Sequence, residues 1–166
     1  MNRSIKLALG IVVIGLAAAA CASDDAPDQQ QGPALPTAAV EILVDDAGIA
    51  HIYADNDEDL FFAYGYQIAS DRLLQLEMFR RFAHGRLSEV LGVNGPGSAG
   101  DTSLIDDRFA RIFNWRHWGR LDAELMKKEA PEDYKLTSAW AAGINKRVRE
   151  VLEGKVKLPF GFGPDE

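Results

Sequence analysis

One long apolar helix, predicted over residues 57–83, constrains this fold more than any other feature. Leu60, Tyr64 and Ile68 recur along it at steps of four, which is the helical period. A helix that is apolar nearly all round is expected to be buried, and an isolated buried charge is very costly. The helix nevertheless carries a set of polar side chains, which are Asp71, Arg72, Gln75, Glu77, Arg80 and Arg81.

These polar side chains allow two interpretations. We interpret them as a structural ion-pair network, because arginine forms bidentate pairs with carboxylates and this helix and its neighbours supply many. The alternative is a site that binds an acidic ligand. Gly65 lies inside the same helix, where glycine costs about 1 kcal/mol relative to alanine. We therefore expect another backbone to pack closely against Gly65.

A β-hairpin is predicted before this helix. Residues 40–44 and 49–53 are rich in valine and isoleucine, and residues 46–48 form a short loop between them. Gly48 can take the positive φ that such a loop requires, and Asn56 is expected to cap the helix that follows. A two-stranded sheet alone is marginal in water, so we expect strands from another segment or chain to complete it.

Further helices are predicted after a loop over residues 93–105. Residues 106–127 look helical, and Pro131 suits the first turn of a last helix that Gly154 is expected to end. The expected fold class is therefore α+β, with a β-hairpin followed by a mainly α-helical segment. In the hairpin, His51 is interpreted as a hydrogen-bonded structural residue rather than a base.

The N-terminus is typical of a bacterial export signal. A basic start is followed by an apolar run that is too short to favour a membrane span, and Cys21 follows that run. We expect residues 1–20 to be a signal peptide and Cys21 to be lipidated, which anchors the protein on the periplasmic side of a membrane. An ordinary secretory signal is the alternative. Residues 21–37 are polar and proline-rich, so they are expected to be a flexible tether before the folded residues 38–166.

Charge and residue usage argue against several other functions. A net charge of -7 argues against nucleic-acid binding, which needs a basic surface. The single cysteine allows no intramolecular disulfide or zinc cluster, and the three histidines lack metal-ligand spacing, so no cofactor or metal is expected in this chain. The glycine-rich residues 95–100 have dinucleotide-motif spacing, but no strand precedes them, so we interpret them as a loop. No catalytic residue is assigned.

Several short patterns follow one another along the chain. The hairpin contains D-x-x-G-I-A-H-I, at Asp45, Gly48, Ile49, Ala50, His51 and Ile52. The long helix contributes Ala63, Gly65, Tyr66, Ala69, Asp71, Arg72, Leu73, Gln75, Glu77, Arg80 and Arg81. Later positions are Gly85, Arg86, Leu87, Glu89, Leu91, Gly92, Asp107, Arg111, Gly143, Asn145, Leu158 and Pro159. In this order they resemble the penicillin acylase family of N-terminal-nucleophile hydrolases, in which proline is usual at the place of Ala50.

The resemblance implies an exported precursor that cuts itself into an α and a β subunit. In that family the β subunit begins with a serine whose own α-amino group acts as the base, and the serine forms an acyl-enzyme with a linear amide. Side-chain amides of β-lactams and N-acyl-homoserine lactones are among the small-molecule substrates. Several members hold calcium, so calcium is expected only in the complete enzyme. The implied fold places β-sheets between helical layers.

The same resemblance places this chain in the N-terminal part of the α subunit, before the nucleophile. We therefore expect the chain alone to be inactive and to need, as its partner, a β subunit or the missing C-terminal portion of a precursor. The chain is then a fragment, the product of a split gene or a degenerate homologue. The alternative from another class is a lipid-tethered, non-catalytic helical binding module, which would fold alone as a monomer.

Overall fold

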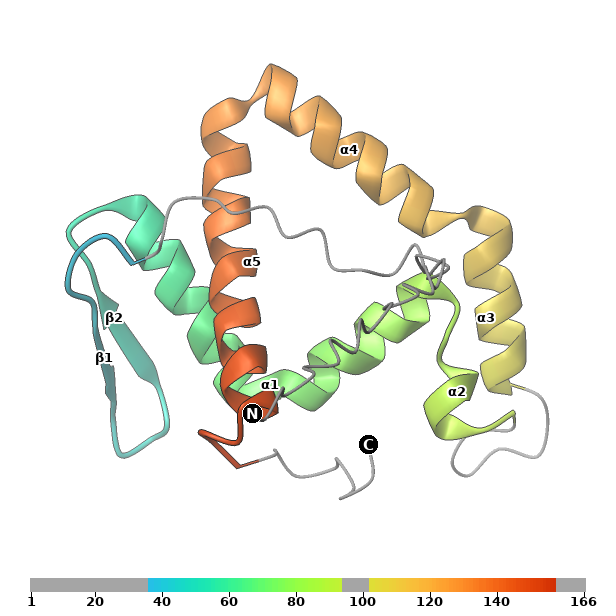
Figure 1. Cartoon of the computed structure of the whole chain (residues 1–166), viewed down its shortest axis with the longest axis horizontal. Helices are drawn as coiled ribbons and strands as arrows, with labels where there is room; N and C mark the ends of the chain where they lie inside the picture. The colour runs from blue at the N-terminus through green and yellow to red at the C-terminus, as the bar shows by residue number, and fades with distance from the viewer. Residues whose placement is uncertain (1–35, 94–101, 158–166) are drawn as a thin grey trace, which may run out of the picture. The chain divides into compact units, whose positions relative to one another are not determined.

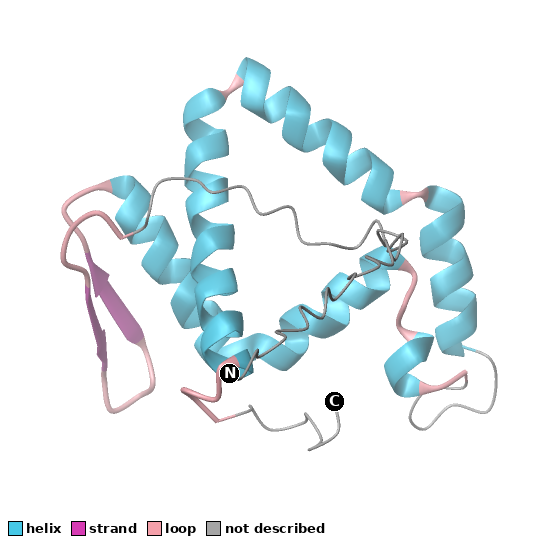
Figure 2. Ribbon diagram, in the orientation of Figure 1, coloured by secondary structure: helices cyan, strands magenta, loops and turns pink. Residues whose placement is uncertain are grey.

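Two short antiparallel strands begin the part of the chain that the computed structural model describes, residues 36–93 and 102–157. β1 (Glu41–Val44) pairs with β2 (Ala50–Tyr53), as Figure 2 shows. All described residues belong to one compact unit, Gly32–Glu166. The predicted signal peptide, Cys21, most of the predicted tether and the glycine-rich loop lie outside the described residues.

Asp45 closes the hairpin turn. Its Oδ1 accepts hydrogen bonds from the backbone N–H groups of Ala47 at 3.0 Å and Ile49 at 2.8 Å. Gly48 has a φ of +80°, which other residues rarely adopt, so the predicted reason for glycine here is confirmed. The bond from Ile49, together with one from His51, lowers the pKa of the Asp45 carboxyl. His51 Nε2 lies 3.2 Å from Asp45 Oδ2, in keeping with its interpretation as a structural residue.

Helix α1 (Asp57–His84) follows the hairpin and ends within one residue of the predicted position. At its start, the Asn56 side chain accepts a bond from the N–H of Asp59, so the predicted cap is confirmed. The helix kinks at Arg72, whose φ is -135°. Just before the kink, Ser70 Oγ donates to the Tyr66 carbonyl at 2.9 Å, a contact that bends helices.

Helix α5 (Pro131–Leu152) crosses α1 at a pair of glycines, and Figure 1 shows the two helices side by side. A Cβ atom on Gly65 would collide with the Trp140 carbonyl, and one on Gly143 would collide with the Phe62 carbonyl. The expectation of a close backbone contact at Gly65 is therefore confirmed. The buried apolar core consists mostly of small residues beside this crossing and farther along the helices: Phe62, Ala63, Ala69, Leu73, Ala110 and Ala139.

The predicted single helix over residues 106–127 is wrong. The structure has α2 (Ser88–Leu91), then α3 (Thr102–Phe113) and α4 (Trp115–Glu129), with a break at Asn114. Asn114 has a φ of +54°, a left-handed conformation that asparagine tolerates better than most residues. The end of the predicted loop over residues 93–105 is also helical, because α3 begins at Thr102.

An aromatic cluster joins the end of α1 to α3 and α4. The Trp115 ring centroid lies 5.3 Å from that of Phe82 on α1 and 5.6 Å from that of Phe109 on α3. Phe113 adds a further ring, 4.4 Å from Phe109. Such pairs contribute about 0.5–1.5 kcal/mol each beyond area burial, so the cluster stabilises the bend between α3 and α4.

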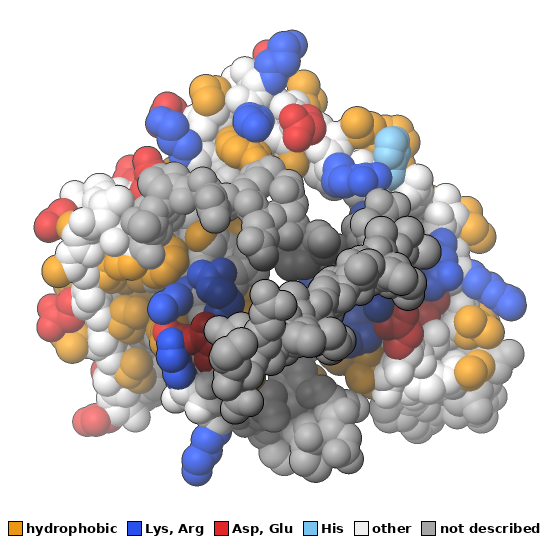
Figure 3. All heavy atoms as spheres, in the orientation of Figure 1, with side chains coloured by type: hydrophobic (Ala, Val, Ile, Leu, Met, Phe, Trp, Pro, Cys, Tyr) orange, Lys and Arg blue, Asp and Glu red, His pale blue; other side chains and the backbone are white. Residues whose placement is uncertain are grey.

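Many large apolar side chains remain exposed in this chain, and Figure 3 shows several of them on the face drawn. The expectation that α1 is buried nearly all round is wrong here, since Tyr64 is 49% and Phe79 is 62% exposed. On α3, Ile112 is 80% exposed. None of the helices in residues 36–93 and 102–157 is long and apolar enough to cross a membrane.

Candidate functional site

Asp107 on α3 is a buried carboxylate that holds the turn between α1 and α2. Its Oδ1 accepts the Leu87 N–H at 2.6 Å, and its Oδ2 accepts the Ser88 N–H at 3.0 Å. Oδ2 also accepts a short bond from the Ser88 hydroxyl. Burial raises the pKa of Asp107, but the bonds from Ser88 and Leu87 outweigh it and hold the pKa below its ordinary value. Asp107 is therefore ionised, and both of its carboxylate oxygens accept hydrogen bonds.

Gly85 and Arg111 complete this corner of the molecule. Arg111 Nε donates to the Gly85 carbonyl at 2.9 Å. Gly85 has a φ of +65°, and a Cβ there would lie 2.7 Å from both Arg111 Cγ and the Asp107 carbonyl oxygen. Only glycine fits such a position without strain. The motif residues after α1 and those on α3 are thus parts of one interlocked turn, which we call the Asp107 corner (Gly85, Leu87, Ser88, Asp107 and Arg111).

Part of the predicted polar network forms a cluster of ion pairs at the end of α1. Glu77 accepts from Arg80 Nε and from Arg81 Nε, each at 2.7 Å. Arg81 also reaches Glu89 on α2 at 3.1 Å, and Arg86 pairs with Glu89 at 2.9 Å. Bonding from Arg80 lowers the pKa of Glu77, although burial opposes the shift. Glu89 and Arg86 were not among the predicted members of this network.

The structure does not bring the other predicted members into that cluster. Asp71 instead accepts from Gln67 Nε2 at 3.1 and 3.0 Å, one helical turn away. Among the described residues, the side chains of Arg72 and Gln75 make no hydrogen bond or ion pair, and both residues are exposed. For Asp71, Arg72 and Gln75, a role in a network stays a prediction.

Asp59 is a second buried carboxylate, and its role was missed from the sequence. It is fully buried and accepts bonds from Thr37 N–H at 2.7 Å, Ala38 N–H at 2.9 Å and Asn56 Nδ2 at 2.8 Å. Burial raises its pKa, but these bonds and one from the Thr37 hydroxyl outweigh it, and the pKa falls to about 2. Asp59 therefore fastens Thr37, the last residue of the predicted tether, to the start of α1.

The serine and threonine hydroxyls whose partners are defined donate to carbonyl, carboxylate or thioether acceptors, not to an imidazole or an amine. Ser70 donates to Tyr66, Ser88 to Asp107 and Thr137 to the Asp133 carbonyl. A hydroxyl engaged in this way has no adjacent imidazole or amine to take its proton, and a serine or threonine nucleophile needs one. What these positions do is hold backbone turns and helix ends.

Comparison with known proteins decides what these motifs belong to. The model of the family described as penicillin amidase matches residues 39–163. This chain belongs to the penicillin amidase family. It is 31% identical over 131 residues to penicillin G acylase of Escherichia coli, covering 75% of this chain and 14% of that protein. It is 32% identical over 99 residues to the acyl-homoserine lactone acylase QuiP of Pseudomonas fluorescens strain Pf0-1, covering 59% of this chain and 11% of that protein.

Structural similarity agrees with the family assignment. A solved structure of thermostable penicillin G acylase from Alcaligenes faecalis superposes with a TM-score of 0.60 at 28% identity, covering 74% of this chain and 59% of that one. The predicted hairpin followed by a mainly helical segment is confirmed. The chain spans about 14% of the length of the first curated penicillin acylases it matches.

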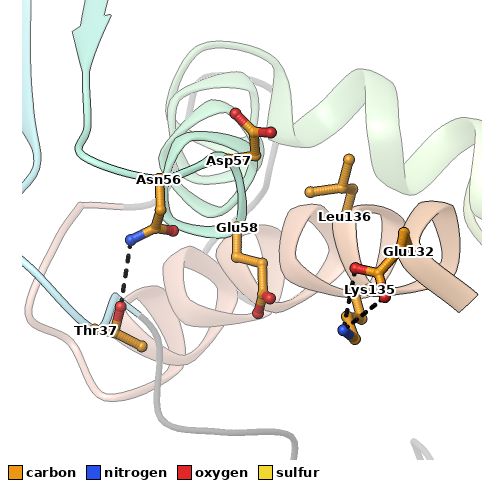
Figure 4. Close-up of a pocket in the computed structure, with 7 residues that line it drawn as sticks. All are labelled: Thr37, Asn56, Asp57, Glu58, Glu132, Lys135 and Leu136. Atoms are coloured by element: carbon orange, nitrogen blue, oxygen red, sulfur yellow. Dashed lines mark hydrogen bonds and ion pairs between the residues drawn. The ribbon is translucent and has the colours of Figure 1, made fainter.

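In this penicillin amidase family member, a recess lies between the start of α1 and the start of α5, with a volume of about 350 Å³. Figure 4 shows Thr37 and Asn56 on one side of it and Glu132 with Lys135 on the other. Lys135 pairs with Glu132 at 2.9 Å. No cluster of three or more histidine, cysteine or acidic side chains able to hold a metal ion occurs among the described residues.

Proposed function

We propose that this chain is the N-terminal part of the α subunit of an exported amidohydrolase that cleaves linear amide bonds. The observation that carries the proposal is the match of the penicillin amidase family model to residues 39–163. The names of the relatives, penicillin G acylase and acyl-homoserine lactone acylase, suggest two substrate classes, the side-chain amides of β-lactams and N-acyl-homoserine lactones. Both are small molecules with an acyl group on nitrogen.

In the proposed reaction, an N-terminal serine outside this chain attacks the amide carbonyl. An acyl-enzyme forms as the amine leaves, and water then releases the acid. Hydrolysis of this kind needs a nucleophile, a base within hydrogen-bond reach and donors for the oxyanion. The hydroxyls of Ser70 and Ser88 are instead engaged in holding helices and turns. The chain therefore supplies framework, and a β subunit or further polypeptide supplies the catalytic groups. Calcium in the complete enzyme stays part of this proposal.

Mixing the chain with a complementary polypeptide tests this function. Purified residues 22–166 are incubated with a chromogenic phenylacetyl amide and with an acyl-homoserine lactone. The assay is repeated after adding the β subunit of E. coli penicillin G acylase and the part of its α subunit that this chain does not cover. We expect turnover only in the mixture, because catalysis requires the added serine.

Two results would count against this function. Turnover by residues 22–166 alone, abolished by Ser88→Ala or by another substitution of its own hydroxyls, would place the nucleophile in this chain. A mixture without turnover, together with a stably folded monomer, would favour the non-catalytic binding module. As a control, the mixture with the added N-terminal serine changed to alanine should be inactive.

We also propose that Cys21 is lipidated and holds the enzyme at the periplasmic side of a bacterial membrane. Support comes from the basic start, the short apolar run and the polar residues 22–37 that follow Cys21. Cells expressing the full chain should incorporate labelled fatty acid into it, and Cys21→Ser should abolish the label. Wild-type protein that is exported without label would make the leader an ordinary secretory signal.

A further inference from the structure

A small cavity lies between the hairpin and the helices α1 and α5, with a volume of about 180 Å³. Most of its lining is apolar: Val40, Ile42, Phe62 and Ala63. The polar groups at its edge are paired with one another, since Glu150 accepts from the Tyr66 hydroxyl at 2.9 Å and lies 3.4 Å from Lys146 Nζ. The cavity thus presents an apolar surface, and the polar groups at its rim already have hydrogen-bonding or ionic partners. An apolar occupant therefore suits it.

The size of the cavity points to a side chain as the occupant. Pockets that hold small molecules are about 300–1,000 Å³, so this cavity is too small for a typical ligand. Beside it, β1 pairs only with β2 within the described residues, which leaves the other edge of β1 available to an extended segment. An exposed strand edge is a ready template for such a segment.

The last turns of α5 end beside this cavity. Lys155 N–H donates to the Glu150 carbonyl at 2.9 Å and Gly154 N–H to the Val151 carbonyl at 3.0 Å. With Gly154 at a φ of +69°, these bonds form a Schellman motif, which reverses the chain at a helix end. Glu150, on the same turn of the helix, lines the cavity.

We propose that this chain's own segment 158–164 docks beside β1 and seats Phe160 in the cavity. The segment reads Leu-Pro-Phe-Gly-Phe-Gly-Pro, without charge and with glycines next to its aromatic residues. Its first aromatic residue lies three positions after Lys157, so an extended backbone carries it about 10 Å beyond the last described residue. A phenylalanine side chain is apolar and of the scale of the cavity, and the segment completes the sheet that two strands leave marginal.

Disulfide trapping in the full chain tests this docking. Cys21 is the only cysteine, so Cys21→Ser gives a background without thiols. In it, Val40→Cys is combined with Gly161→Cys, next to the proposed anchor. The matched control combines Gly161→Cys with Ile112→Cys on α3, a site that is 80% exposed. Under mild oxidation the first pair should close an intramolecular disulfide about tenfold faster than the control, because a disulfide requires its two Cα atoms to be within about 7 Å.

The remaining outcomes show whether Phe160 of the same chain, the segment of a second copy or neither occupies the cavity. Adding Phe160→Ser to the first pair should bring its rate down to that of the control. Equal rates for the two pairs, in protein whose circular dichroism matches the parent, would overturn the proposal. Disulfide-linked dimers whose yield rises with protein concentration would also overturn it, since the segment of a second copy would then fill the cavity.

Discussion

Replacing Gly143 by alanine should destabilise the chain by about 3 kcal/mol or more, at or beyond the upper end of ordinary overpacking. The added methyl would collide with the Phe62 carbonyl and would lie 2.8 Å from the Tyr66 N–H. These are backbone atoms of α1, so no side-chain rotation can relieve the contact and the two helices must move apart. Urea unfolding followed by circular dichroism measures the effect as a midpoint lowered by about 1–3 M.

The matched control for this substitution is Gly119→Ala in the middle of α4. No atom lies within 4 Å of the place where its Cβ would be. There alanine should stabilise the helix by up to about 1 kcal/mol, because glycine is the poorer helix former. Equal effects of the two substitutions would show that the crossing of α1 and α5 is looser than the structure has it. Gly65→Ala should behave like Gly143→Ala, since its methyl would meet the Trp140 carbonyl.

Local signals in the sequence predicted α1 well. Asn56 was expected to cap it, and its side chain does so by accepting a hydrogen bond from the N–H of Asp59 in the first turn. The pairs of Glu77 with Arg80 and Arg81 are likewise three and four residues apart, the spacing at which helical side chains meet. Features that depend on neighbours along the chain can therefore be predicted without a structure.

The break between α3 and α4 could not be predicted in this way. The break falls at an asparagine, Asn114, and not at a proline or glycine. The flanking residues continue an apolar helical pattern. The cause lies in tertiary packing, because Trp115 must turn to meet Phe82 on α1. Asp59 was missed for a similar reason, since its partner Thr37 is 22 residues away. The family patterns marked Asp107 without indicating what it holds.

Replacing Asp107 by alanine should destabilise the chain by about 3 kcal/mol, because two buried N–H groups and a hydroxyl would lose their acceptor. Arg111 beside it would also lose the charge that balances its own. The turn from Gly85 to Ser88 would then be free to move, and α2 would lose its attachment to α3. Urea unfolding measures the total loss. Hydrogen exchange at the Leu87 and Ser88 amides reports the local opening, which should be faster than in the parent chain.

Asp106→Ala is the matched control for this substitution, one residue away on the same helix. Among the described residues, the Asp106 side chain has no hydrogen bond or ion pair, so its removal should change stability by no more than about 0.5 kcal/mol. Asp107→Asn should fall between the two, because an amide keeps one acceptor oxygen but loses the charge. If Asp106→Ala were as destabilising as Asp107→Ala, the loss of stability would come from removing any negative charge from α3, not from the hydrogen bonds to Asp107. Slow exchange at Leu87 and Ser88 in Asp107→Ala would show that the turn holds without its carboxylate.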